Sequence, residues 1–186
     1  MADALFIGED YVKRNSVIDE NIDVKLIIPS IKDAQDMFLH PCLGTTFYNG
    51  LKTRIVAGTT TADEDTLISS YIAPMLVKYV QLELVDNLLI RYRNKNVSKK
   101  SSDNSSPVDF RDYQNQLDRY THKAEWFKQR LIDYLYANDD LFDEYREVND
   151  ASDIYPESNA YTSPFYLGTD KYYDKEDCEC NPRYYL

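Results

Sequence analysis

Residues 110–134, FRDYQNQLDRYTHKAEWFKQRLIDY, carry the clearest structural signal in the chain. Apolar and aromatic side chains return at alternating intervals of three and four residues, which is the spacing of a heptad seam on an α-helix. The residues between them are mostly charged. Because such a seam has to be buried against other helices, the stretch predicts a helical bundle. The seam consists of Phe110, Tyr113, Leu117, Tyr120, Ala124, Phe127, Leu131 and Tyr134.

The natural partner of this helix lies upstream, over residues 63–93. Thr61 and Glu64 have the spacing of a capping box at its start, and apolar residues follow at helical intervals. Pro74 lies inside and is expected to kink or split the helix. Residues 94–107, NKNVSKKSSDNSSP, are polar and of low complexity, which predicts a mobile loop. We therefore expect an antiparallel helical hairpin that makes most of the core.

Two shorter helices are expected ahead of this hairpin. Asp23 is a candidate N-cap for the first, which Pro29 either kinks or begins and which Pro41 and Gly44 end. The second starts directly afterwards, at a cap supplied by Thr45 or Thr46, and Gly58 closes it. Apolar residues at helical spacing run through both stretches, so both are expected to face the same core.

The composition agrees with one all-α domain. The chain has 186 residues, which is enough for one core and short for two. Its 5 glycines are too few for the tight turns of a sandwich or barrel. No apolar run approaches the roughly 20 residues that span a bilayer, and the first residues are not expected to be a signal peptide. We expect an extended N-terminal segment over 1–22, a bundle of about four helices over 23–149, and an extended, Tyr-rich and acidic C-terminal arm over 150–186.

Charge is distributed unevenly along the chain. The net charge is −11, and residues 138–186 alone hold 13 acidic and 4 basic residues. An acidic chain is a poor stand-alone binder of nucleic acid, although it can surround DNA without gripping it. One basic concentration spans the end of the long upstream helix and the polar loop. These basic residues have an ordinary explanation, because cations suit a helix C-terminus and loop lysines are usually solvated. A functional role would be contact with DNA in a channel or with an acidic neighbouring surface. Its members are Arg91, Arg93, Lys95, Lys99 and Lys100.

The C-terminal arm is rich in tyrosine. Eight of the 17 tyrosines follow Asn138, and the prolines there forbid a long helix. A solvated tail would carry few aromatic residues, so we expect the arm to dock on a partner; a weakly ordered appendage, or tyrosine richness without function, are the alternatives. The candidate interface residues are Tyr155, Tyr161, Tyr166, Tyr172, Tyr173, Tyr184 and Tyr185.

Residues that carry chemistry are few. The two histidines, His40 and His122, have no second histidine at ligand spacing, and structural or surface roles are expected for both. Cys178 and Cys180 lack the paired knuckles of a zinc site, and Cys42 reads as a small buried residue. An odd cysteine count without a secretory signal suggests reduced thiols in a cytoplasm. We therefore expect no enzyme activity, cofactor or metal.

Six stretches carry a resemblance to a known family: ALFIGEDYVKRNSVIDENID, VKLIIPSIKDAQDMFLHPCLGTTFYNGL, YIAPMLVKYV, NKNVSKKSSDNSSP, AEWFKQRLIDYLYAND and LFDEY. In this order they resemble the head-to-tail connector (adaptor) proteins of tailed bacteriophages, closest to those of crAss-like phages. The resemblance covers roughly residues 4–145. Its most specific part comprises Ile31, Ala34, Gln35, Asp36, His40, Pro41, Leu43, Gly44, Thr45 and Tyr48.

The resemblance implies a helical subunit of a homo-oligomeric ring, typically of about twelve copies. Such a ring lies at the head–tail junction of the virion, is assembled in the host cytoplasm, and binds the portal protein and a further tail component. It lines the channel through which DNA passes without being read, and it involves no membrane. Other phage packaging or tail-completion proteins and a cytoplasmic helical interaction module stay open as alternatives. An enzyme such as a cell-wall hydrolase is disfavoured because no catalytic constellation is present.

Overall fold

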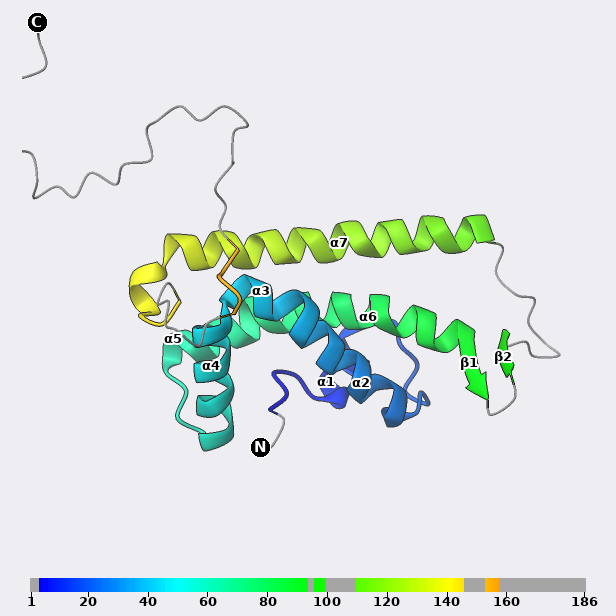
Figure 1. Cartoon of the computed structure of the whole chain (residues 1–186), viewed down its shortest axis with the longest axis horizontal. Coiled ribbons are helices and arrows are strands. Elements are labelled where there is room, and N and C mark those ends of the chain that lie inside the picture. The colour runs from blue at the N-terminus through cyan, green and yellow to red at the C-terminus, as the bar shows by residue number, and fades with distance from the viewer. Residues whose placement is uncertain (1–3, 94–95, 100–109, 146–152, 158–186) are drawn as a thin grey trace, which may run out of the picture.

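The computed structural model describes residues 4–93, 96–99, 110–145 and 153–157. Helices build nearly all of this part, which confirms the all-α class. Figure 1 shows α6 (Ala73–Leu89) and α7 (Phe110–Ala137) running antiparallel and side by side along the long axis, as the sequence predicted. On its other side, α6 packs against α2 (Val24–Ala34).

The first helical stretch begins where the sequence predicted. The Asp23 carboxylate accepts a hydrogen bond from the Lys25 amide, which confirms Asp23 as the N-cap of α2. The chain then continues through a π-helical turn, η1 (Gln35–Leu39), into α3 (His40–Leu43). Gly44, with a φ of 74°, ends this path.

Both π-helical turns precede a proline. The second, η2 (Ile68–Ile72), follows α5 (Ala62–Leu67) and leads into α6. The first turn ends two residues before Pro41, and the second ends two residues before Pro74. A proline ring clashes with the carbonyl four residues earlier in an α-helix, and the wider π turn moves that carbonyl aside. Pro41 therefore lies within α3 rather than ending the helix, and Pro74 does not separate α5 from α6.

Of the caps predicted for the helices that follow Gly44, one is wrong and two are confirmed. Gly44 itself is the N-cap of α4 (Thr45–Ala57), and no side chain supplies the cap hydrogen bond that the sequence assigned to a threonine. Gly58, with a φ of 66°, closes α4 as predicted. At α5, the Thr61 hydroxyl and the Glu64 carboxylate form the predicted capping box.

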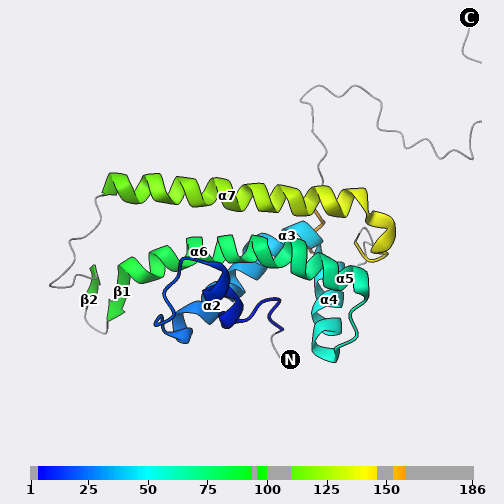
Figure 2. The ribbon, with the colours of Figure 1, turned by 180° about the vertical axis from the view of Figure 1, so that it is seen from behind.

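Part of the N-terminal segment predicted to be extended is helical. Residues Glu9–Asn15 form α1, which lies against α2 and α6 in Figure 2. Acidic residues start this helix and Lys13 and Arg14 lie in its last turn, an order that suits the helix dipole. Val12 is fully buried, so this segment belongs to the bundle.

The end of α6 differs from the prediction. The helix stops at Leu89, and β1 (Ile90–Arg93) pairs antiparallel with β2 (Asn96–Lys99). Ile90 and Tyr92 in β1 and Val97 in β2 favour a strand, and two residues separate the strands, which is a hairpin spacing that the polar composition concealed. The predicted helix to residue 93 and the predicted mobile loop from 94 are therefore wrong over the strands, and the rest of that loop lies outside the described residues.

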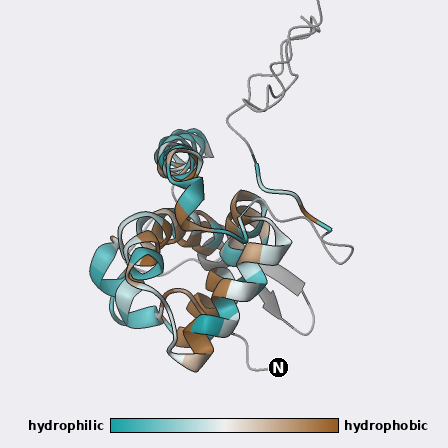
Figure 3. Cartoon of the chain, turned by 90° about the vertical axis from the view of Figure 1, so that its left-hand side faces the viewer, coloured by the Kyte–Doolittle hydropathy of each residue, from teal (hydrophilic) through white to brown (hydrophobic). Residues whose placement is uncertain are grey.

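The core is shared more evenly than predicted. One cluster joins the buried faces of α2, α3, α4 and α6 to four residues of α7, and these are Ala124, Leu131, Ile132 and Leu135. Figure 3 shows apolar colour where the helices face one another, whereas α7 is mainly hydrophilic. The α6–α7 hairpin therefore forms only part of the core. No helix in the described ranges is long and apolar enough to cross a bilayer.

The two seam leucines should differ in their contribution to stability. Leu131 is fully buried, so Leu131→Ala should lower the free energy of unfolding by about 2 to 5 kcal/mol through lost contacts and a cavity. Leu117 is only half-buried, and Leu117→Ala should cost less than about 1.5 kcal/mol. Urea unfolding followed by circular dichroism measures both, and equal losses would contradict the burial seen here.

Candidate functional site

Residues 153–157, here called the strap, return to the bundle and cross the corner between α3 and α4 (Figure 1). The Thr45 amide donates to the Ile154 carbonyl at 3.0 Å, and the Glu157 amide donates to the Pro41 carbonyl at 2.9 Å. The first amides and last carbonyls of a helix have no partner inside that helix. The strap therefore satisfies backbone groups that the corner leaves unpaired.

The Thr45 hydroxyl is the hub of the strap contacts. It donates to Asp153 Oδ1, and it accepts from the Ile154 amide at 3.1 Å. His40 Nε2 lies 3.0 Å from the same oxygen. Because the Thr45 hydroxyl donates to Asp153 and accepts from the Ile154 amide, His40 is assigned as a donor through Nε2. A nucleophilic threonine would need the histidine as an acceptor, so this triad holds the strap and does not activate Thr45.

The surroundings of His40 disfavour its charged form. Its ring stacks on Tyr48 with centroids 4.5 Å apart, and the Tyr48 hydroxyl donates to Asp36 at 2.7 Å. Burial lowers the pKa of His40, an effect that Asp153 and Asp36 oppose and Lys52 reinforces. His40 is therefore a neutral structural donor at neutral pH, in agreement with the structural role predicted for it.

Gly44 lets the strap approach the corner closely. A Cβ atom at this position would lie 2.7 Å from Pro156 Cδ, and its φ of 74° is a conformation that other residues rarely adopt. A larger residue at position 44 would therefore be disfavoured twice, by the positive φ and by contact with Pro156.

A second anchor lies at the far end of the strap. Lys128 Nζ on α7 contacts Glu157 Oε2 at 2.8 Å. Burial opposes the charge on Lys128, yet the hydrogen bond to Glu157 keeps its pKa above the usual value. Cys42 lies near this ion pair and is fully buried. Burial raises the pKa of its thiol to about 12, while the charge of Lys128 lowers that pKa and the charge of Glu157 raises it. This confirms Cys42 as a small buried residue with an unreactive thiol.

The same helical path holds the N-terminal segment on another side. The Phe6 amide donates to Gln35 Oε1 at 2.8 Å, and Gln35 Nε2 donates to the Ala4 carbonyl at 3.3 Å. Gln35 is itself buried. One short stretch, from Gln35 to Thr45, therefore fixes segments from both ends of the described chain.

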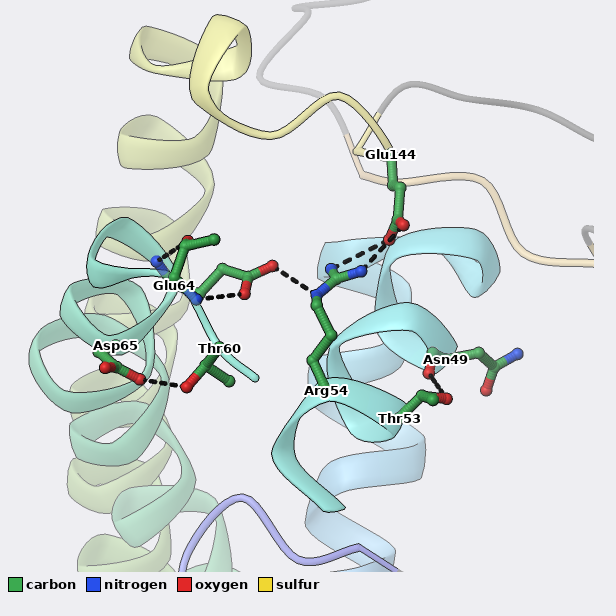
Figure 4. A network of polar contacts seen from close by, with 8 residues as sticks. Asn49, Thr53, Arg54, Thr60, Glu64, Asp65 and Glu144 are labelled. Atoms are coloured by element: carbon green, nitrogen blue, oxygen red, sulfur yellow. Dashed lines mark hydrogen bonds and ion pairs between the residues drawn. The ribbon is translucent and has the colours of Figure 1, made fainter. Parts of the chain in front are cut away.

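A polar network at the end of the bundle joins three elements (Figure 4). Arg54 of α4 donates two hydrogen bonds to Glu144, at 2.9 and 3.0 Å. Its Nε lies 2.7 Å from Glu64, whose other oxygen accepts from the Thr61 amide at 2.9 Å. Hydrogen bonding to Glu144 and the nearby carboxylates raises the pKa of Arg54 further. The chain after α7, which passes through η3 (Asp139–Leu141), is clamped to α4 and α5 in this way.

The structure places some of the predicted site residues and leaves others undescribed. Arg91 and Arg93 lie on β1 and Lys99 on β2. Tyr155 lies in the strap with its side chain 62% exposed, and His122 is exposed on α7. The remaining candidates fall outside the described residues, and they are Lys95, Lys100, Tyr161, Tyr166, Tyr172, Tyr173, Tyr184, Tyr185, Cys178 and Cys180.

Residues 153–157, the described part of the expected arm, lie on the bundle of their own chain, whose corner offers unpaired backbone groups. Docking of the arm on a partner stays a prediction. The roles of Thr45, Arg54, Glu144 and Lys128 were missed. Among the described residues no three His, Cys, Asp or Glu side chains converge as metal ligands.

Loss of Arg54 should destabilise the bundle more than loss of the Glu144 charge. Arg54→Ala leaves the buried Glu64 without its cation, and about 2 to 4 kcal/mol of unfolding free energy should be lost, less than for a fully buried pair because Arg54 is partly exposed. Glu144→Gln keeps one acceptor and should cost about 1 kcal/mol. Arg14→Ala, at an exposed position, is the control; losses that do not differ among the three variants in urea unfolding would contradict the network.

Gly44→Ala should lower the free energy of unfolding by about 1 to 3 kcal/mol, since it adds backbone strain and displaces Pro156. Gly58→Ala is the matched control: Gly58 also has a positive φ but has no atom within 4 Å of the added carbon, so only strain is expected. Adding Pro156→Ala to Gly44→Ala should recover the difference between the two. Thermal and urea unfolding measure it, and equal costs for the two glycines would argue against the strap contact.

Comparison with known proteins gives one match. No curated protein and no solved structure matches the chain. A family of unknown function (DUF6712) matches residues 39–154, a span that begins at the end of η1, includes α3 to α7 and reaches the strap at Ile154. Because this span is more than half of the 186 residues, the chain belongs to the family of unknown function DUF6712.

Proposed function

We propose that the chain is a structural subunit of the head-to-tail connector ring of a tailed phage, which joins the portal to the tail and surrounds the DNA channel. The proposal starts from the resemblance of residues 4–145 to connector proteins. The observation that carries it further is the position of the most specific resembling residues. Gln35, Gly44 and Thr45 are the residues that hold the N-terminal segment and the strap on the bundle.

A fixed corner suits a subunit that reaches its neighbours through terminal segments. The strap is tied to α3, α4 and α7, so the chain beyond Glu157 starts from a defined point on a rigid body. Tyr155, exposed within the strap, offers an aromatic ring and a hydroxyl at this point. We propose that the following tyrosine-rich residues contact other copies of the chain, the portal or the next tail component.

The β1–β2 hairpin suits the channel side of such a ring. It extends α6 at the end of the bundle away from α4 and α5 (Figures 1 and 2), and it carries Arg91, Arg93 and Lys99. A conduit has to tolerate every DNA sequence, so its contacts would be to phosphates and weakened by salt. The acidic balance of the whole chain, −11, favours passage over tight binding.

The chemistry of the corner supports a structural role over an enzymatic one. His40 and Asp153 both hydrogen-bond to Thr45, and the only cysteine that the structure describes is buried with a raised pKa. These groups stabilise the fold and are not poised for proton transfer to a substrate.

Co-expression with the portal protein of the same genome tests the proposal. Native mass spectrometry of the purified complex should give the mass of the portal ring plus a fixed number of 21.8 kDa chains, with twelve expected. A chain that stays monomeric at every concentration and does not co-purify with the portal would rule the connector role out.

A hairpin variant separates assembly from DNA contact. Arg91→Gln, Arg93→Gln and Lys99→Gln together should leave the mass of the complex unchanged and weaken the salt-sensitive retention of double-stranded DNA. Sequence-selective retention by the parent ring at physiological salt would contradict a channel lining.

A further inference from the structure

A small pocket lies between helix α6, helix α7 and the connection from α1 to α2. Its volume is about 180 Å³, which is below the roughly 300 Å³ at which pockets begin to hold drug-sized ligands, so it suits a single large side chain. Asp19 and Gln81 contribute its polar lining. The rest of the lining is mainly apolar, and it includes Val17, Ile18, Ile22 and Leu84.

Two lysines lie at the edge of this pocket. Lys78 Nζ donates to Gln81 Oε1 at 3.4 Å, and Lys123 Nζ lies 5.5 Å from the centroid of the Tyr120 ring, which also lines the pocket. Burial lowers the pKa of Lys78, and the charge of Lys123 lowers it further, so the two ammonium groups repel each other. Within the described part of the chain, neither lysine forms an ion pair with a carboxylate. A bound anion would relieve this repulsion.

The chain beyond the strap contains one segment whose pattern matches the pocket and its lysines. Among the tyrosines after Glu157, only Tyr172 has an acidic residue two positions before it and another two positions after it, Asp170 and Asp174. Alternate residues of an extended segment point to the same side, about 6.4 to 6.8 Å apart. An extended segment would therefore present one tyrosine between two carboxylates. Its opposite side would carry Lys171, Tyr173 and Lys175.

We propose that Tyr172 of one chain enters this pocket on a second copy of the chain. The carboxylates on either side of it, Asp170 and Asp174, then lie beside the two lysines at the pocket edge. The inference rests on the proposed connector ring for the second copy, and it names the surface that receives the arm. A tyrosine ring is apolar and its hydroxyl is polar, which matches an apolar pocket with a few polar lining groups. The opposite charges favour this segment over a neutral or basic one.

The strap and the pocket lie on opposite faces of the bundle. The strap is on the viewer's side in Figure 1, whereas the connection between α1 and α2 is on the viewer's side in Figure 2, which shows the bundle from behind. An arm that leaves one face and a pocket on the other form a head-to-tail contact, which is the kind that closes into a ring. Asp170 follows Glu157 by 13 residues, a reach of about 43 to 47 Å when extended, and a helix is only about 10 to 12 Å wide. The segment can therefore reach a neighbouring bundle.

A peptide titration tests the docking itself. A fluorescein-labelled peptide of residues 166–177 is added to the full chain carrying Tyr172→Ala, so that the receptor's own arm does not compete. Fluorescence polarisation should show saturable binding. Tyr172→Ala in the peptide should weaken binding at least about tenfold, because it removes the side chain that fills the pocket, whereas Tyr173→Ala, on the opposite side of the segment, should leave it unchanged. Absence of saturable binding, or equal effects of the two substitutions, would overturn the proposal.

Charge exchange tests the two lysines. Lys78→Glu with Lys123→Glu in the receptor should weaken binding of the parent peptide at least about tenfold, and a peptide with Asp170→Lys and Asp174→Lys should recover binding to that receptor. Lys123→Glu alone, at an exposed position, should weaken binding in the same direction and serves if circular dichroism shows that the double variant does not fold. Arg119→Glu, also exposed on α7, is the control for charge alone. Undiminished binding to the Lys123→Glu receptor, or an exchanged peptide that recovers nothing on a folded double variant, contradicts the lysine contacts and overturns the proposal.

Chemical crosslinking separates a second copy from the same chain. Val17→Cys, at a position 80% exposed on the pocket edge, is combined with Lys175→Cys, and Cys178→Ser and Cys180→Ser remove the other accessible thiols. Cys42 is fully buried. A bismaleimide reagent should link the assembled chains into a ladder on a denaturing gel. An internally linked monomer, or no link between the two positions, sinks the proposal.

Failure of this contact is distinguishable from failure of the connector role. A portal complex of unchanged mass formed by the Lys78→Glu, Lys123→Glu variant would overturn the pocket contact and leave the connector role intact. A crosslinked ladder from a chain that does not bind the portal would rule out the connector role and support the contact between copies.

Discussion

Helix ends leave backbone groups without partners, and the fold depends on how this constraint is met at Gly44. Two helices meet there with almost no connecting residues, so the carbonyls of α3 and the amides of α4 face the same small region. The strap fills that region and supplies both kinds of partner. The hub at Thr45, the close approach of Pro156 to Gly44 and the ion pair at Lys128 are all consequences of bringing an extended segment to this corner.

The same stretch shows how the chain uses proline without losing helical continuity. A wider turn precedes Pro41 and another precedes Pro74, so the two long helical paths pass both rings. The first of these turns begins with Gln35, whose amide side chain holds the N-terminal segment. The π-helical turn thus makes room for Pro41 and also carries the glutamine that binds the N-terminal segment. These two tasks give a physical reason for having both residues in this stretch.

Much of the helical layout could be predicted because its signals are local. The heptad seam of α7, the Asp23 cap, the capping box at Thr61 and the stop at Gly58 all lie within a few residues of what they control. The hairpin was missed because its polar composition hid a strand spacing. The site was missed for another reason: Thr45 and Asp153 are 108 residues apart and Arg54 and Glu144 are 90 apart, and among 32 acidic and 21 basic residues no single sequence reveals which ones pair.

The separation of the strap from its corner also orders events during synthesis. Contacts between residues that are close in sequence form first, because closing a long loop costs entropy before any contact compensates for it. The helices of the bundle, and the pairing of α2 with α6, can form while the later part of the chain is still on the ribosome. The strap follows α7 by only a short stretch, so it is translated last among the described residues and reaches a corner that is already built. Until then the amide of Thr45 and the carbonyl of Pro41 lack their partners in the strap and are left to water.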